Sequence, residues 1–200
     1  MPARKTAFVR GGYYHFYNRG AGRQSIFQSD ENYRFLLRLM RNVMPDLKVS
    51  VIAYCLLPNH YHWLIRQVGE LPAGLLPQRV FNRYSKAFNN QQGRSGTLFE
   101  GRYKVIAVES DEYLRHLCRY IHLNPVRHGF AQDPAAWPYS NYLEWVNGRA
   151  GKLVDREFIV AHFRDARVYE EYVRSFMQGC AHPPQGLADY LVALEQDRSK

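Results

Sequence analysis

The sequence predicts an α+β fold: a ferredoxin-like (RRM-like) βαββαβ antiparallel sheet with helices on one face, plus a helical C-terminal extension. Two stretches rich in β-branched and aromatic residues flank Pro58-Asn59, which is the pattern of a β-hairpin. Apolar residues recur at helical spacing on either side of that hairpin. A further strand pattern lies outside each helix, which completes the split-βαβ order. The expected strands are 11–18, 47–57, 60–66 and 103–110, and the expected helices are 30–43 and 74–90.

The spacing of apolar residues and the residues at the ends identify the helices. Residues 30–43 begin with two acidic side chains, which favour a helix N-terminus. Within 74–90 an apolar residue recurs at every fourth position, and Pro77 lies near the start. A third helix, 111–124, follows the last strand and is expected to stop at Pro125.

The chain beyond residue 130 has a different character. A turn-rich linker leads into short helical patterns, and we expect two units: residues 1–130 and a helical extension, 131–200, packed on or beside the first. The helical patterns lie around 140–147, 155–163, 167–178 and 186–196.

Charge is distributed unevenly between these units. The formal net charge is +9, but residues 1–130 hold 19 Lys and Arg against 8 Asp and Glu, whereas 131–200 hold 8 against 10. Arginine greatly outnumbers lysine, which suits bidentate contact with phosphate. We therefore expect an anionic polymer to bind the first unit. The alternative is a surface charge that only aids solubility.

The cysteines and the apolar segments bear on the compartment. Three widely spaced cysteines without a CxxC pair argue against a disulfide framework and predict a reducing cytoplasm. No signal-peptide core and no run of about 18 apolar residues occurs, so no membrane partner is expected.

The stretch LPNHYHWLI places His60 and His62 one residue apart on an expected strand. Side chains at i and i+2 of a strand lie on the same face, so the two imidazoles could bind one divalent metal ion. Two ligands are too few, and a third must come from elsewhere in the protein or from substrate. The alternative is a pair of partly exposed histidines on an open sheet face.

The stretch RYIHLNPVRHGF, residues 119–130, offers complementary groups. Tyr120 and Asn124 are four residues apart and share a helix face. Asn124 could supply an oxygen ligand, although Pro125 is expected to push its backbone toward an extended conformation. A phenol has a pKa of about 10, but a nearby cation would ease ionisation of Tyr120 and make it a nucleophile. The alternative for Tyr120 is an aromatic packed on the sheet, and for His116, one turn earlier, a surface position rather than a part in proton transfer.

These motifs together resemble a known family. The stretch LPNHYHWLI resembles the His-hydrophobic-His signature of HUH nucleases, and 96–129 is similar to the block that follows it in REP-associated single-tyrosine transposases. The stretches YHFYNRGAGRQSIFQSDENY and WPYSNY also look like segments of that group. The resemblance covers about residues 10–145.

The resemblance implies that 1–130 is a catalytic HUH domain. It places His60, His62 and Asn124 on the metal ligands, with Mg²⁺ or Mn²⁺ as cofactor, and Tyr120 on the nucleophile. It implies cleavage and rejoining of single-stranded DNA, often beside a hairpin, through a 5′-phosphotyrosine link and a free 3′-hydroxyl. It also implies a bacterial protein associated with the nucleoid, and it leaves monomer and homodimer open.

Basic and aromatic residues are candidates for DNA contact. Aromatic side chains on the first strand could stack on bases where they face outward. The expected phosphate contacts come from loops and from the end of the third helix, and the alternative for each is a solvated basic rim. These basic residues are Arg19, Arg23, Arg94, Arg102, Lys104 and Arg127.

Two other functions compete with DNA cleavage. An RNA-recognition domain has the same element order, but no RNP1-like string occurs in this sequence. A domesticated transposase that binds hairpin DNA or RNA as a regulator, with little or no catalysis, is the second alternative. The intact residues His60, His62 and Tyr120 argue for retained chemistry.

Overall fold

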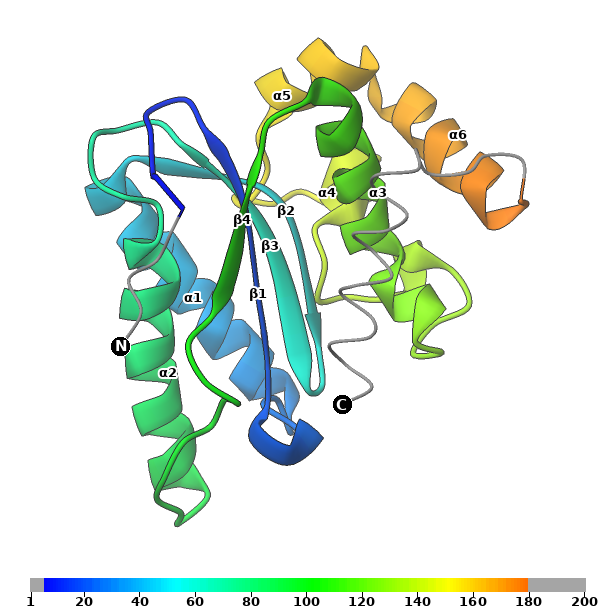
Figure 1. Ribbon diagram of the computed structural model, residues 1–200. Coiled ribbons are helices and arrows are strands. Elements are labelled where there is room, and N and C mark those ends of the chain that lie inside the picture. The colour runs from blue at the N-terminus through cyan, green and yellow to red at the C-terminus, as the bar shows by residue number, and fades with distance from the viewer. Residues whose placement is uncertain (1–5, 180–200) are drawn as a thin grey trace.

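A computed structural model describes residues 6–179 and confirms the predicted ferredoxin-like fold (Figure 1). The four strands are antiparallel and lie in the order β2-β3-β1-β4, so that β1 and β3 form the centre of the sheet. Within the described residues no helix combines the length and apolarity needed to cross a bilayer. The elements are β1 (Tyr13–Arg19), a 3-10 turn η1 (Ala21–Arg23), α1 (Asp30–Leu47), β2 (Val49–Leu57), β3 (His60–Gln67), α2 (Leu75–Gln91), β4 (Lys104–Val108), α3 (Asp111–Arg127), η2 (Pro134–Ala136), α4 (Tyr142–Trp145), α5 (Arg156–Phe163) and α6 (Ala166–Met177).

Helices α1 and α2 cover one face of the sheet. Alternate residues of the central strands, among them Phe16 of β1 and Trp63 of β3, point into this layer and are fully buried. The apolar stripes of the two helices, such as Leu36 and Val80, pack against them. This apolar core holds the central strands in a fixed register.

The opposite face is covered by α3 together with α4, α5 and α6 (Figure 1). Asn141 ties the extension to the sheet, because its Nδ2 donates to the Ile52 carbonyl (2.9 Å) and its Oδ1 accepts from the Tyr54 amide (2.8 Å). Three of the four helical patterns predicted beyond residue 130 correspond to α4, α5 and α6. The fourth, 186–196, lies outside the described residues. Since both faces are covered, β2 is buried along almost its whole length.

The expected end of the third helix was wrong. Helix α3 continues to Arg127 with Pro125 inside it, so Asn124 is helical rather than extended. Proline removes only one N–H from the helix, and its own carbonyl still accepts hydrogen bonds. Near the C-terminus the cost is small, because the amides of His128 and Phe130 bond to the carbonyls of Asn124 (3.1 Å) and Pro125 (2.8 Å).

Candidate active site between the sheet and helix α3

The two histidines of β3 lie side by side beneath α3. The two-residue turn at Pro58-Asn59 pairs β3 with β2, and the separate pairing of β3 with β1 places His60 beside Arg19 and His62 beside Tyr17. Both histidines face away from α1 and α2. They are nevertheless 7% and 1% exposed, because α3 covers this face. The interpretation of partly exposed histidines on an open sheet is therefore wrong.

A neighbour holds the Nδ1 atom of each imidazole. His60 Nδ1 lies 2.7 Å from Asn59 Oδ1, an acceptor, so this nitrogen carries the proton. His62 Nδ1 lies 2.9 Å from Nε2 of the buried His15 on β1. A metal ion bound by this pair would therefore meet the Nε2 atoms. Fixing the second ring nitrogen by a hydrogen bond is the usual means of orienting a metal-binding histidine.

One face of α3 lies against this pair. The Tyr120 ring is 5.6 Å from the His62 ring, and the His128 ring is 5.0 Å from the His60 ring. Asn124 lies one helical turn after Tyr120 and four residues before His128, which follows the last residue of α3, and its Nδ2 donates to the Tyr120 carbonyl (2.8 Å). The amide oxygen of Asn124 is thus the atom suited to a metal ion. The structure brings all four predicted catalytic and metal-binding residues to this interface.

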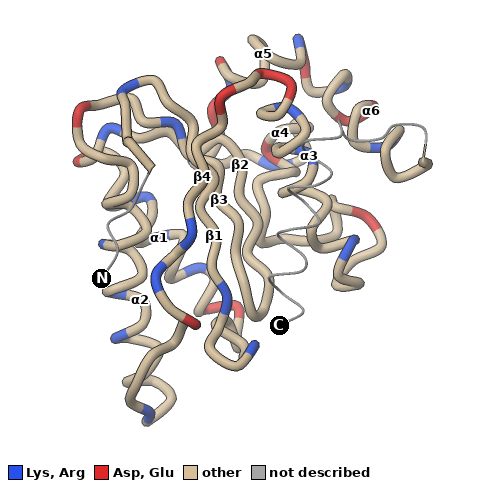
Figure 2. The backbone as a smooth tube through the Cα atoms, viewed as in Figure 1, with Lys and Arg blue, Asp and Glu red and all other residues tan. Residues whose placement is uncertain are grey.

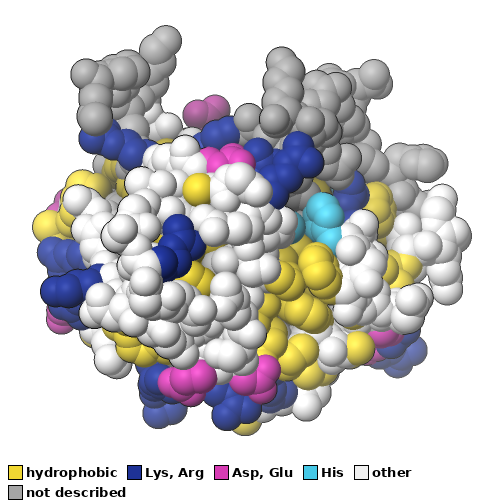
Figure 3. All heavy atoms as spheres, turned by 90° about the horizontal axis from the view of Figure 1, so that it is seen from below, with side chains coloured by type: hydrophobic (Ala, Val, Ile, Leu, Met, Phe, Trp, Pro, Cys, Tyr) yellow, Lys and Arg dark blue, Asp and Glu magenta, His cyan; other side chains and the backbone are white. Residues whose placement is uncertain are grey.

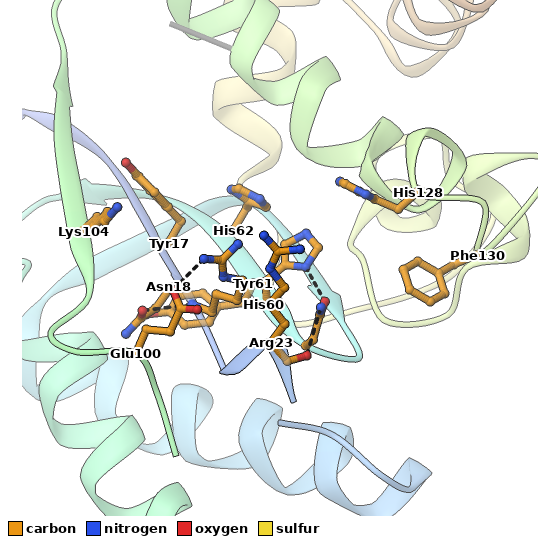
Figure 4. Close-up of a pocket in the computed structure, with 12 residues that line it drawn as sticks. Tyr17, Asn18, Arg23, His60, Tyr61, His62, Glu100, Lys104, His128 and Phe130 are labelled. Carbon is orange, nitrogen blue, oxygen red and sulfur yellow. Dashed lines mark hydrogen bonds and ion pairs between the residues drawn. The ribbon is translucent and has the colours of Figure 1, made fainter. Parts of the chain in front are cut away.

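A cavity of about 280 Å³ opens beside the histidines (Figure 4). His60, His62 and His128 direct their rings toward it, with Lys104 and Tyr17 on the β4 side. Figure 3 views this end of the molecule, the lower end in Figure 1, and shows histidine atoms at the surface beside apolar and basic side chains. Tyr120 and Asn124 do not line the cavity. Tyr120 is 4% exposed and is packed on the sheet.

Tyr17 is the aromatic residue of the first strand that reaches the cavity. Its ring stacks on His62, with centroids 5.9 Å apart and planes at 20°. Tyr14 and Phe16 face the α1–α2 core instead, and Tyr13 packs against Phe158 of α5. The sequence could not say which half of these aromatics faces the site.

Three of the predicted DNA-binding residues line the cavity: Arg19, Arg23 and Lys104. Arg19 forms an ion pair with Glu100, Nη2 to Oε2 at 2.8 Å. Burial, together with the nearby Arg19 charge, lowers the pKa of Lys104 from its ordinary value. The cavity is thus basic, and one carboxylate offsets part of its charge.

The other three predicted DNA-binding residues lie elsewhere. Arg94 joins two loops, because it donates to Gln24 Oε1 (3.0 Å) and to the Thr97 carbonyl (3.1 Å). Arg102 lines a second cavity. Arg127 places its guanidinium 5.3 Å from the centre of the Tyr120 ring. Arg127 is therefore beside the candidate nucleophile rather than in the cavity.

Sequence reasoning assigned no role to four residues of the site: His15, Asn59, Glu100 and His128. His128 follows Asn124 by four residues, but the expected helix end at Pro125 concealed that shared face. His15 could be found only with the strand register, which no local pattern supplies.

Two histidines of α3 serve the packing of the extension instead. His116 Nδ1 accepts from Arg119 (2.6 Å) and contacts the Tyr172 hydroxyl (3.0 Å), away from the cavity. Burial and the Arg119 charge lower its pKa. His122 contacts Asn141 and the Tyr169 hydroxyl. Among the described residues no group of three or more His, Cys, Asp or Glu is placed to hold a metal ion.

The split-βαβ sheet carries an imidazole pair that faces a tyrosine of α3, as the resemblance to single-tyrosine transposases implied. The sequence matches the family described as "Transposase IS200 like" over residues 8–124, more than half of the chain. The chain belongs to this IS200-like transposase family. The matched segment includes the two histidines, Tyr120 and Asn124.

Individual relatives agree with this assignment. The chain is 25% identical over 145 residues to the REP-associated tyrosine transposase of Escherichia coli K12, which covers 71% of this chain and 83% of the relative. A relative from Haemophilus influenzae is also 25% identical, over 150 residues, 68% of this chain and 82% of its own. Among solved structures, a REP-associated tyrosine transposase bound to a REP hairpin superposes with a TM-score of 0.61 at 23% identity. It covers 78% of this chain and 94% of its own, and it supports the fold.

Proposed function

We propose that this transposase cleaves and rejoins single-stranded DNA, beside hairpins of REP type, through a covalent link to Tyr120. The observation that carries the proposal is the contact of the Tyr120 ring with the His62 ring. His62 lies on the same strand face as His60, and the chain belongs to the IS200-like family. The hairpin substrate is inferred from the REP-associated relatives.

The reaction follows from the phenol. Tyr120 Oη attacks the phosphorus of a phosphodiester, a P–Oη bond forms and the bond to the 3′-oxygen breaks. The phenol proton is lost and the 3′-oxygen gains one, which leaves a 5′-phosphotyrosine and a free 3′-hydroxyl. Attack of a 3′-hydroxyl on the phosphotyrosine reverses the step. Because the number of phosphodiester-type bonds is conserved, no external energy source is needed.

We propose His60, His62 and Asn124 as ligands of Mg²⁺ or Mn²⁺. The Nδ1 contacts of the two histidines fit this role, since they direct Nε2 to the ion. Three protein ligands leave positions for substrate, and the bound ion would polarise a phosphate oxygen. Arg23 and Lys104 would contact the backbone phosphates.

The donor set predicts the preferred metal. Magnesium favours oxygen ligands, whereas manganese tolerates imidazole nitrogen better. We expect more cleavage with Mn²⁺ than with Mg²⁺ at equal low concentration, measured by titration of each ion into a cleavage assay. Clearly superior Mg²⁺ would contradict the two-imidazole site.

A hairpin-binding regulator with little catalysis is the second candidate. One observation favours it: Tyr120 is 4% exposed and lies outside the cavity lining. Attack requires its Oη to reach phosphorus, so α3 and the sheet must separate slightly or the substrate must enter between them.

Covalent capture decides between the two candidates. Hairpin oligonucleotides with labelled single-stranded flanks are incubated with protein and Mn²⁺ and run on a denaturing protein gel. We expect a protein–DNA band that disappears in Tyr120→Phe. Tyr113→Phe, which removes a phenol from the same helix, is the matched control and should retain the band. Binding without any covalent band, with either ion, would favour the regulator.

A further inference from the structure

A second cavity, of about 610 Å³, lies across one stretch of chain from the active-site cavity. In the segment 99–104, Glu100 and Lys104 line the first cavity, whereas Arg102 and Tyr103 line the second. Asn18 and Tyr61 line both. We propose that the second cavity binds an unpaired purine base of the DNA strand whose backbone occupies the active-site cavity. This inference rests on the proposed function and extends it to a base-specific contact.

Polar side chains of α2 form one wall of this second cavity. Gln78, Asn82 and Ser85 all line it, and their spacing places them on one helix face. Within the described part of the chain none of the three side chains forms a hydrogen bond or ion pair. A carboxamide offers a donor and an acceptor together, which matches the N6 and N7 edge of adenine. Arg102, on the facing segment, has the geometry for O6 and N7 of guanine. Both edges belong to purines.

Aromatic rings form the apolar part of the lining and hold each other in place. Phe81 stacks on Tyr61 with centroids 4.4 Å apart, and the Phe99 ring meets Phe81 edge-on at 4.9 Å. The Tyr103 hydroxyl donates to the Gly74 carbonyl (2.7 Å), and Asn18 Nδ2 donates to the Gly101 carbonyl (3.0 Å). These contacts fix the segment that separates the two cavities. A base entering here would meet an ordered apolar surface formed by these rings.

The charge around this cavity suits a polyanion. Helix α2 contains no Asp or Glu, and its exposed cations Arg79, Arg83 and Lys86 form no ion pair within residues 6–179 (Figure 2). On α1, by contrast, Arg38 pairs with Glu31. None of the residues that line the second cavity is acidic. Phosphates beside a bound base would therefore meet Arg102 and no carboxylate in the cavity lining, whereas Arg79, Arg83 and Lys86 lie outside that lining.

Selection of randomised substrates tests this site. Hairpins with randomised single-stranded flanks are selected for binding to the full chain in the Tyr120→Phe background, so that cleavage does not alter the pool. We expect a purine preference of about tenfold at one flanking position, the order that a good base contact supplies. Gln78→Ala combined with Asn82→Ala should reduce that preference below about twofold and weaken binding. Asn90→Ala, an exposed amide on the same helix outside both cavities, should leave the preference intact.

The outcomes separate this inference from the proposed function. Hairpin binding with the same base preference in the double variant, or with no purine preference in the parent, would overturn the second site and leave the proposed function standing. Absence of hairpin binding by every variant would overturn the proposed function and this inference together. Arg102→Gln approaches the cavity from the facing segment, and it should also lower the preference if the double variant proves unstable in a thermal melt.

Discussion

The two faces of strand β3 are equally buried but differ in chemistry. Tyr61, Trp63 and Ile65 face α1 and α2, whereas His60 and His62 face α3. Aromatic packing dominates in the first group: the Trp63 ring lies 4.9 Å from the Phe81 ring and nearly parallel to it. The second group needs partners, because a buried polar atom without a hydrogen bond costs about 1–3 kcal/mol.

The exposed fraction of a side chain therefore does not distinguish an apolar core from a candidate site. The presence of hydrogen-bond partners for buried polar side chains does. His15 and Asn59 hold the Nδ1 atoms of the histidines, and neither contact is needed to close the sheet. Leucine at positions 60 and 62 would bury more apolar surface without any partner. Two oriented imidazoles in such a place are costly for stability, which supports the chemistry proposed for them.

The largest expected effect comes from the apolar face. Trp63→Ala should lower the free energy of unfolding by about 3–5 kcal/mol, because it removes a fully buried ring and leaves a cavity. Urea unfolding followed by circular dichroism measures this loss. His62→Ala, the neighbouring change on the other face, should cost only about 1–2 kcal/mol, since it removes one hydrogen bond and less apolar surface.

Trp63→Phe serves as the control for this comparison. It keeps an aromatic ring and removes an indole N–H that has no acceptor among the described residues. Its cost should stay well below that of Trp63→Ala, because most of the buried ring volume is kept. If His62→Ala destabilised the protein as much as Trp63→Ala, the α3 face would be an ordinary core and the contrast between the faces would fail.

The same contrast explains what the sequence could predict. Alternation along β3 and helical periodicity depend on neighbours in the chain, so the strand order, the hairpin turn and the pairing of His60 with His62 were accessible. Contacts set by strand register and helix docking were not. His15 of β1 contacts His62 of the neighbouring strand β3, and Glu100 pairs with Arg19, which lies 81 positions earlier in the chain. The reach of α3 past Pro125 was missed because a proline near a helix end has two outcomes that local sequence does not distinguish.

A smaller effect should separate function from stability on the polar face. Asn59→Ala removes the acceptor that fixes His60 Nδ1, so the imidazole can rotate away from its metal-binding orientation. Manganese affinity, measured by titration calorimetry, should fall about tenfold, at the lower end of the range for partners of metal ligands. Asn59 is only half-buried, and the urea midpoint should change little. An unchanged manganese affinity would show that the turn does not orient His60.

The smallest expected effect concerns the charged rim of the polar face. Glu100 pairs with Arg19, whose side chain is 14% exposed, and so one cation of the cavity is engaged by a carboxylate rather than by phosphate. Glu100→Gln should strengthen binding of hairpin DNA about threefold. The slope of log Kd against the logarithm of the salt concentration should increase by up to about one, because one more phosphate contact releases one more counterion.

Glu70→Gln is the matched control for this change. Glu70 pairs with Arg10 on the open surface, where both side chains are more than two-thirds exposed, and neither residue lines the active-site cavity. Its removal should leave DNA affinity unchanged. Weaker rather than stronger binding by Glu100→Gln would mean that the carboxylate positions Arg19 for phosphate instead of competing with it. The charged side chains of the polar face, like its imidazoles, would then be held in position before substrate binds. In this the polar face would resemble the apolar face, whose side chains are fixed by packing.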